Sequence, residues 1–144
     1  MELPEYITVD EVRRVCRALG IRDWTALKEA EVLAEEADLI LREVNSSEMN
    51  IDPADFRQGL EVELEHGTRF ADANVTNNHP ILTGKIVLAH LKETLDYYKR
   101  IEVAEIEGDL LQAVRANDLA RIRSKYQKLV NAQLVLNQAV AAQL

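Results

Sequence analysis

Two segments set the helical pattern of this chain: DFRQGLEVELEHG at residues 55–67 and TGKIVLAHLKETLDYY at residues 83–98. In both segments, apolar residues recur every three or four positions, which is the spacing of one helix face. The pattern predicts two amphipathic helices. Glu63 and His90 fall on the apolar faces, where a buried polar group must be paired, hydrogen-bonded or bound to a metal. The two helices therefore mark a candidate site.

The composition of the whole chain is that of a helical protein. Of the 144 residues 47% are hydrophobic, and only five are Gly and three are Pro, which leaves little turn chemistry for a sheet. The length is that of one ordinary globular domain. We therefore expect an all-α protein, an irregular bundle of about five or six helices with a long C-terminal helix.

Capping signals set the expected helix bounds. Thr8 and Glu11 form a capping box, and Gly20 can close the helix that follows. Asp52-Pro53 and Pro80 can open later helices, and Asn117-Asp118 can cap the last one. The expected helices cover residues 9–19, about 25–44, 53–66, about 80–107, 110–116 and a final segment reaching nearly to 144, with a break at Gly108-Asp109.

The chain is expected to divide into a helical core domain, residues 1–108, and a C-terminal helical extension, residues 109–144. From Leu129 onward there is no charged residue. This segment is too polar to cross a bilayer and too apolar on most faces to stand alone in water. We therefore expect residues 129–144 to contact protein partners or to form a homo-oligomer.

Charge and composition exclude several classes of function. A formal charge of −8 argues against nucleic-acid binding, which needs clustered Lys and Arg. No leader-like or membrane-spanning apolar run is present, so we expect a cytoplasmic protein with no membrane partner. Cys16 is the only cysteine and is expected to be a small core residue. The acidic residues around Glu35 and Glu36 are interpreted as a solvated helix face or, alternatively, as a mimic of a nucleic-acid strand.

The polar residues of the two central helices form the candidate site. If the helices run antiparallel, Glu63-x-x-His66 and His90-x-x-Glu93 lie at matched heights. Four such ligands can hold a divalent metal, with zinc, iron and manganese all compatible. The alternatives are a buried hydrogen-bond network that includes Tyr97 or Tyr98, and proton-transfer catalysis.

Three further residues bear on this site. Gly59 and Gly84 are expected to allow close helix crossings, since glycine otherwise destabilises a helix. His79 precedes Pro80 and is interpreted as a surface residue or, alternatively, as part of the rim of the site.

The segments 55–67, 74–76 (NVT), 83–93 (TGKIVLAHLKE) and 96–98 (DYY) resemble a family of small proteins classed only as a domain of unknown function, reported in bacteria and tailed phages. The resemblance implies a family-like nucleus at residues 52–107 and an insertion-like helix at 24–44. It implies no activity. Its occurrence among phages raises a role as a virion or assembly component.

Two functions follow as expectations. The leading one is a non-enzymatic structural or interaction protein that contacts partners through residues 129–144. The alternative is a divalent-metal-binding protein or metal-dependent enzyme that uses Glu63, His66, His90 and Glu93.

Overall fold

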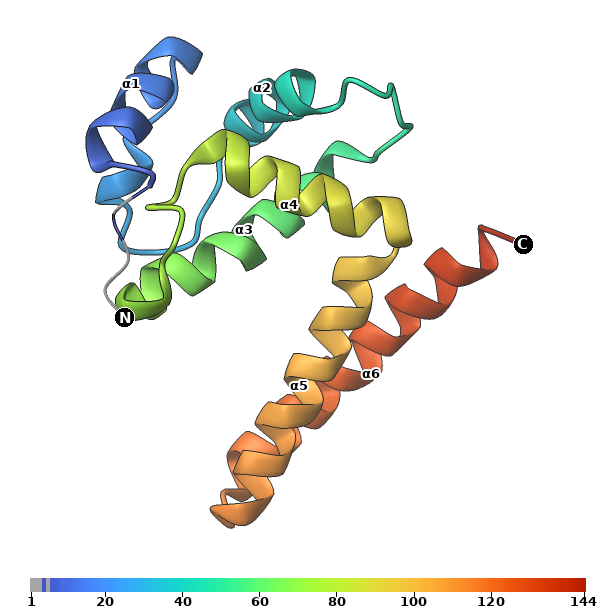
Figure 1. Ribbon diagram of the computed structural model, residues 1–144. Helices are drawn as coiled ribbons and strands as arrows, with labels where there is room; N and C mark the ends of the chain where they lie inside the picture. Colours follow the sequence, from blue (N-terminus) through green and yellow to red (C-terminus); the bar gives the residue numbers. More distant parts are fainter. Residues whose placement is uncertain (1–3, 5) are drawn as a thin grey trace. The chain divides into compact units, whose positions relative to one another are not determined.

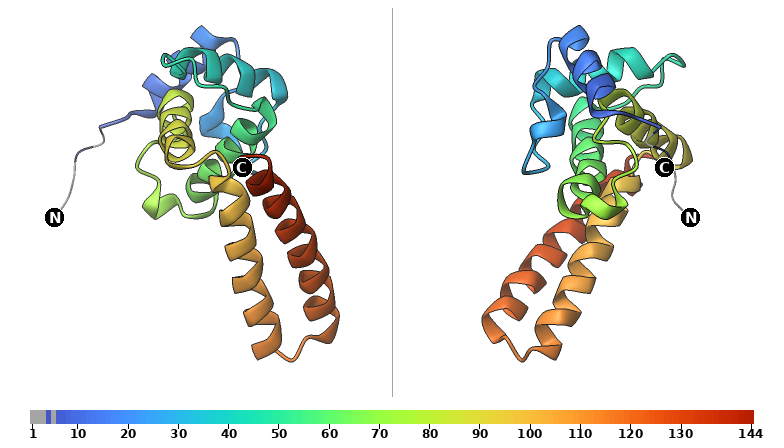
Figure 2. Two further views of the ribbon diagram at one scale, coloured as in Figure 1. Left: turned by 90° about the vertical axis from the view of Figure 1, so that its right-hand side faces the viewer. Right: turned by 60° about the vertical axis from the view of Figure 1, so that its left-hand side comes forward.

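The computed structural model describes residue 4 and residues 6–144 (Figures 1 and 2). Within them the chain forms six α-helices, two short 3-10 helices and no strand, which confirms the all-α prediction. None of these helices is both long and apolar enough to span a membrane. The α-helices are α1 (Val9–Leu19), α2 (Ala34–Val44), α3 (Pro53–Arg69), α4 (Pro80–Glu93), α5 (Tyr97–Arg115) and α6 (Leu119–Ala141), and the 3-10 helices are η1 (Trp24–Ala26) and η2 (Ala71–Ala73).

The chain forms two compact units, Met1–Lys92 and Glu93–Leu144. The first contains α1 to α3 and nearly all of α4, and the second contains α5 and α6. The predicted core of residues 1–108 and extension of residues 109–144 would divide the chain within α5. Each unit is described by itself below.

The helix ends that depend on neighbouring residues lie where the capping signals predict them. The Thr8 hydroxyl accepts a hydrogen bond from the Glu11 amide at 3.2 Å, and Gly20 closes α1 with a φ of 72°. Asp52 and Asp118 cap α3 and α6 through their carboxylates. These caps stabilise the helices through contacts only a few residues apart.

The core of the first unit is formed by apolar side chains from all four helices and from η1. Cys16 is among them, as predicted, and its burial raises the pKa of its thiol. The large fully buried apolar residues of this unit include Val12 and Cys16 on α1, Trp24 in η1, Ile40 on α2, Phe56, Leu60 and Leu64 on α3, and Pro80, Val87 and Leu91 on α4.

Gly84 allows α4 to cross close to its neighbours, as predicted. A Cβ at this position would lie 2.6 Å from Ile40 Cγ2 and 3.3 Å from Val44 Cγ1, both on α2, and 3.5 Å from Phe56 Cζ on α3. The first distance is shorter than van der Waals contact, so a side chain at position 84 requires α2 and α4 to move apart. Gly59 is buried on α3.

The predicted helix at 25–44 is wrong in its first half, because α2 begins only at Ala34. The cause is Glu36, which is buried and not part of a solvated face. Its carboxylate accepts hydrogen bonds from the Arg22 side chain at 2.7 and 2.9 Å and from the Leu33 amide at 3.2 Å. Burial by itself raises the pKa of Glu36, but these hydrogen bonds outweigh it and lower the pKa. The hydrogen bond from the Leu33 amide to Glu36 fixes the first turn of α2, so the helix begins directly after Leu33.

The predicted helix at 80–107 is also wrong, because α4 ends at Glu93 and α5 begins at Tyr97. The buried Asp96 carboxylate accepts hydrogen bonds from the Thr94 hydroxyl and from Arg100 at 2.8 and 2.9 Å. These hydrogen bonds satisfy the carboxylate at the start of α5. The expected break at Gly108-Asp109 does not occur, since α5 continues to Arg115 and a Cβ at Gly108 would meet nothing within 4 Å.

The second unit is an antiparallel hairpin of α5 and α6 (Figure 2). Its seam contains the buried residues Ala113 on α5 and Leu129 and Ala132 on α6. Asp109 on α5 pairs with Arg121, at 3.6 Å, and with Lys125 across the hairpin. The long C-terminal helix was predicted, and it forms this hairpin with the helix directly before it.

Candidate functional site

Glu63 on α3 lies between two histidines. Its Oε2 is 3.7 Å from His66 Nδ1 one turn further along α3, and its Oε1 is 3.7 Å from His90 Nε2 on α4. The side chain of Glu63 is 15% exposed, that of His90 is 29% exposed and that of His66 is 64% exposed. At 3.7 Å these contacts are ion pairs when the imidazoles carry a proton, and they are longer than hydrogen bonds. The structure therefore brings three of the four predicted site residues together.

The fourth predicted ligand, Glu93, is the last residue of α4, where it is exposed, and it belongs to the second compact unit. Among residue 4 and residues 6–144, no group of three or more His, Cys, Asp and Glu side chains has the arrangement of a metal site. In the second unit, Tyr98 is buried and packs edge-on against Tyr97, with ring centroids 5.2 Å apart. The four-ligand metal site remains a prediction.

A cavity of about 240 Å³ adjoins Glu63 and His66. Its wall includes residues 74–76, which follow η2. The chain after η2 packs closely against α3, because a Cβ added at Gly67 would lie only 1.9 Å from Asn78 Oδ1. Asn74 donates hydrogen bonds to that same oxygen at 3.1 Å and to the Gly67 carbonyl at 3.3 Å. The cavity thus has a carboxylate, an imidazole and hydroxyl groups on a hydrogen-bonded frame. It is lined by Glu63, His66, Gly67, Ala73, Asn74, Val75, Thr76, Thr83 and Ile86.

His79 is buried, so its interpretation as a surface residue was wrong, and it is not among the residues that line this cavity. It is 7% exposed, and its Nδ1 accepts hydrogen bonds from the Ile81 and Leu82 amides at 3.2 and 3.4 Å. Burial lowers the pKa of His79. The neutral imidazole therefore caps the N-terminus of α4. The sequence His79-Pro80 is compatible with this role but does not predict it.

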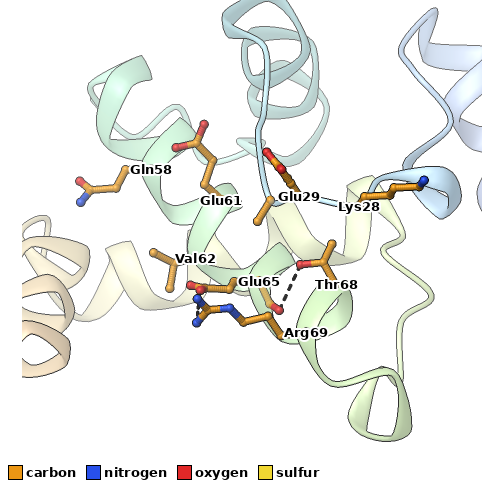
Figure 3. Close-up of a pocket in the computed structure, with 9 residues that line it drawn as sticks. Lys28, Glu29, Gln58, Glu61, Val62, Glu65, Thr68 and Arg69 are labelled. Atoms are coloured by element: carbon orange, nitrogen blue, oxygen red, sulfur yellow. Dashed lines mark hydrogen bonds and ion pairs between the residues drawn. The ribbon is translucent and has the colours of Figure 1, made fainter. Parts of the chain in front are cut away.

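A second cavity, of about 410 Å³, lies beside α3 on the face that carries Glu61 and Glu65 (Figure 3). Helical geometry places these residues roughly opposite Glu63. Glu65 pairs with Arg69, and Glu61 accepts a hydrogen bond from the Val32 amide at 3.2 Å. The sequence did not indicate this cavity, because its other wall, residues 28–30, was expected to be helical.

The third candidate is a surface of the hairpin. Asp109, Arg121 and Lys125 mark one side of its seam. A rotation of about 100° per residue places five apolar residues on the other side, on adjoining stripes of the two helices. We call this surface the hairpin apolar face: Leu110 and Val114 on α5, and Leu119, Tyr126 and Val130 on α6.

Four of the five residues of this face are exposed. Leu119 is the most exposed of them, and Val130 is 48% exposed. The predicted partner segment, residues 129–144, therefore overlaps the face only at Val130. The other residues of the face on α6, Leu119 and Tyr126, could have been located from the spacing of apolar residues along the whole helix.

Comparisons with known proteins place the chain in a family. The family model described as a protein of unknown function (DUF5661) matches residues 12–107, so the chain belongs to this family. No curated protein matches the chain, and no solved structure matches it. The matched range includes Glu63, His66, His90 and Glu93, and it ends before the last turns of α5.

Proposed function

We propose that this chain, as a member of the DUF5661 family, is a non-enzymatic interaction protein that binds protein partners through its C-terminal hairpin. The observation that carries the proposal is the hairpin apolar face. A soluble domain rarely exposes a contiguous group of large apolar side chains without a partner, because their exposure to water is unfavourable.

The arrangement of polar residues on the hairpin supports this proposal. The ion pairs of Asp109 with Arg121 and Lys125 lie on the side away from the hairpin apolar face. A face free of charged groups at its centre and polar at its edges is typical of a protein interface. As a component of a phage, such a protein would join the virion or an assembly intermediate; the family resemblance in the sequence is what suggests this setting.

Photo-crosslinking in the native host tests the proposal. A photoreactive phenylalanine analogue replaces Tyr126 on the face or Val135 on the opposite side of α6, which is similarly exposed. We expect a discrete protein adduct from position 126 and none from position 135. Equal labelling at both positions, or none at either, would contradict the proposal.

A second candidate function, divalent-metal binding, is favoured by the position of Glu63 between His66 and His90. Two ligand atoms on a tetrahedral zinc ion, each bonded at about 2.1 Å, lie roughly 3.4 Å apart. Each Glu63 oxygen is 3.7 Å from an imidazole nitrogen, one of His66 and one of His90. Small side-chain movements would therefore allow the three residues to bind a single ion. Zinc, iron and manganese all accept this ligand set, and the adjoining cavity leaves room for water ligands.

Calorimetric titration of the chelator-treated protein with Zn²⁺ tests this candidate. We expect one equivalent to bind and Glu63→Gln to abolish binding, because the variant loses the carboxylate. Glu29→Gln, on an exposed residue of the second cavity, serves as the control and should leave binding unchanged. Absence of binding to the unmodified chain would eliminate the metal-binding function.

A further inference from the structure

We infer that the hairpin apolar face is covered by the same face of a second copy of this chain. This inference rests on the proposed function and names the partner. The two hairpins would stack face to face, with α5 of one copy over α6 of the other, and form a four-helix bundle. Antiparallel helix pairs of this kind bury apolar stripes efficiently.

The distribution of charge favours a second copy over a strongly charged partner. Residues 93–144 contain seven acidic and seven basic side chains, so the formal charge of −8 lies entirely on residues 1–92. Two copies that meet through their first units would repel each other. Contact through the neutral hairpins brings no net charge together at the interface itself.

The edges of the face carry complementary charges. Helical geometry places Glu107 at the outer edge of the face on α5 and Arg123 at its outer edge on α6. Both are exposed, and neither belongs to an ion pair within residue 4 and residues 6–144. When α5 stacks over α6 of a second copy, Glu107 of one copy and Arg123 of the other lie along the same edge. The pair forms twice in a symmetric dimer.

The size of the face fits a weak, reversible dimer. The face extends from Leu119 to Val130 on α6, eleven steps or about 17 Å, and two adjacent helices are roughly 20 Å wide. It therefore covers about 330 Å² per copy, or roughly 660 Å² for two, which is less than the approximately 1,000 Å² of a stable interface and makes the dimer concentration-dependent.

Light scattering of the purified full-length chain over a range of concentrations tests the inference. We expect a mass of twice 16.3 kDa for the unmodified chain. Val130→Lys should raise the dissociation constant at least about tenfold, because it buries a charge in the apolar contact. The matched control is Val135→Lys. Val135 is the same residue type on the same helix at 45% exposure, against 48% for Val130, but it points away from the face, so the dimer should persist.

A charge exchange makes the test independent of folding defects. Glu107→Arg and Arg123→Glu should each weaken association by about threefold to tenfold, and the double variant should restore it. Circular dichroism confirms that each variant is folded. Failure of the double variant to recover association would exclude this stacking.

The failure of the inference can be separated from failure of the proposed function. A monomeric chain at all concentrations would overturn the second-copy inference. If position 126 still crosslinked to a different protein in the native host, the interaction function would stand. If the chain were monomeric and position 126 formed no adduct, both would fall.

Discussion

At the scale of single residues, His79 shows how burial changes the role of a titratable group. Its imidazole caps α4 in the neutral state, and burial lowers its pKa. The unfolded chain takes up a proton at a pKa near 6.5, and the folded chain does so only at lower pH. The stability that depends on the neutral form is therefore present above the unfolded pKa and is lost as pH falls below it.

His79→Asn tests this linkage. The Asn oxygen can accept the same amide hydrogen bonds but does not titrate, so we expect the variant to keep α4 capped and to lose stability less steeply between pH 7 and pH 5. The measurement is urea unfolding at each pH. His66→Asn, at a largely exposed histidine, is the control and should keep the steeper profile. Equal profiles for the unmodified chain and His79→Asn would contradict the capping role.

Asp96 provides a second titration, in the acidic range. The hydrogen bonds from Arg100 outweigh the opposing effect of burial and, with that from Thr94, lower the pKa of Asp96 to about 2. Because the folded pKa is below the unfolded value, the stabilisation is present above about pH 4 and is lost as pH falls toward 2.

Asp96→Asn should therefore lower the free energy of unfolding by roughly 1–2 kcal/mol at pH 7 and should have a smaller effect at pH 2. Thermal unfolding monitored by circular dichroism across this range measures the difference. Asp72→Asn, at an exposed position, should change little at either pH. A constant effect of Asp96→Asn at all pH values would show that the carboxylate charge is unimportant.

At the scale of the helices, two glycines on helical positions have opposite environments. Gly84 faces Ile40, Val44 and Phe56 at contact distance or closer, whereas a Cβ at Gly108 meets nothing within 4 Å. Alanine favours a helix over glycine by about 1 kcal/mol at either position. Only at Gly84 does the added methyl group also strain the packing between helices, at a cost of about 1–3 kcal/mol.

We expect Gly108→Ala to raise the free energy of unfolding by about 0.5–1 kcal/mol and Gly84→Ala to lower it. Gly84→Val should be more destabilising still, because a larger side chain must fit between α2 and α4. Denaturant unfolding of the three variants gives the comparison. Stabilisation by Gly84→Ala would mean that the helices can separate without cost.

At the scale of the whole molecule, a neutral hairpin follows an acidic first unit in the same chain. The first unit has a compact apolar core, while the hairpin buries few side chains and exposes many large apolar ones. A hairpin of this kind gains stability from a partner, because association removes the same apolar area from water. The stability of the protein should therefore depend on its concentration.

We expect the thermal midpoint of the unmodified chain to rise with protein concentration, since mass action favours a folded dimer. Val130→Lys should remove this dependence, and Val135→Lys should keep it. Differential scanning calorimetry at concentrations about a hundredfold apart measures the change. A midpoint that is independent of concentration would contradict the dimer.

The helical class and most capped helix ends follow from the sequence alone, and the closeness of Glu63 to His66 follows from their spacing on one helix. The caps at Thr8, Asp52 and Asp118 are local, since donor and acceptor are two or three residues apart.

The start of α2, the role of His79, the contact of Glu63 with His90 and the exposed apolar side of the hairpin were not predictable without the three-dimensional fold. Each of these depends on partners or burial that come from folding. Glu36 is held by Arg22, fourteen positions away, and the hairpin apolar face exists only once α5 and α6 are aligned. A pattern of residue types records which side chains need burial or a partner, but the partner itself is set by contacts distant in sequence.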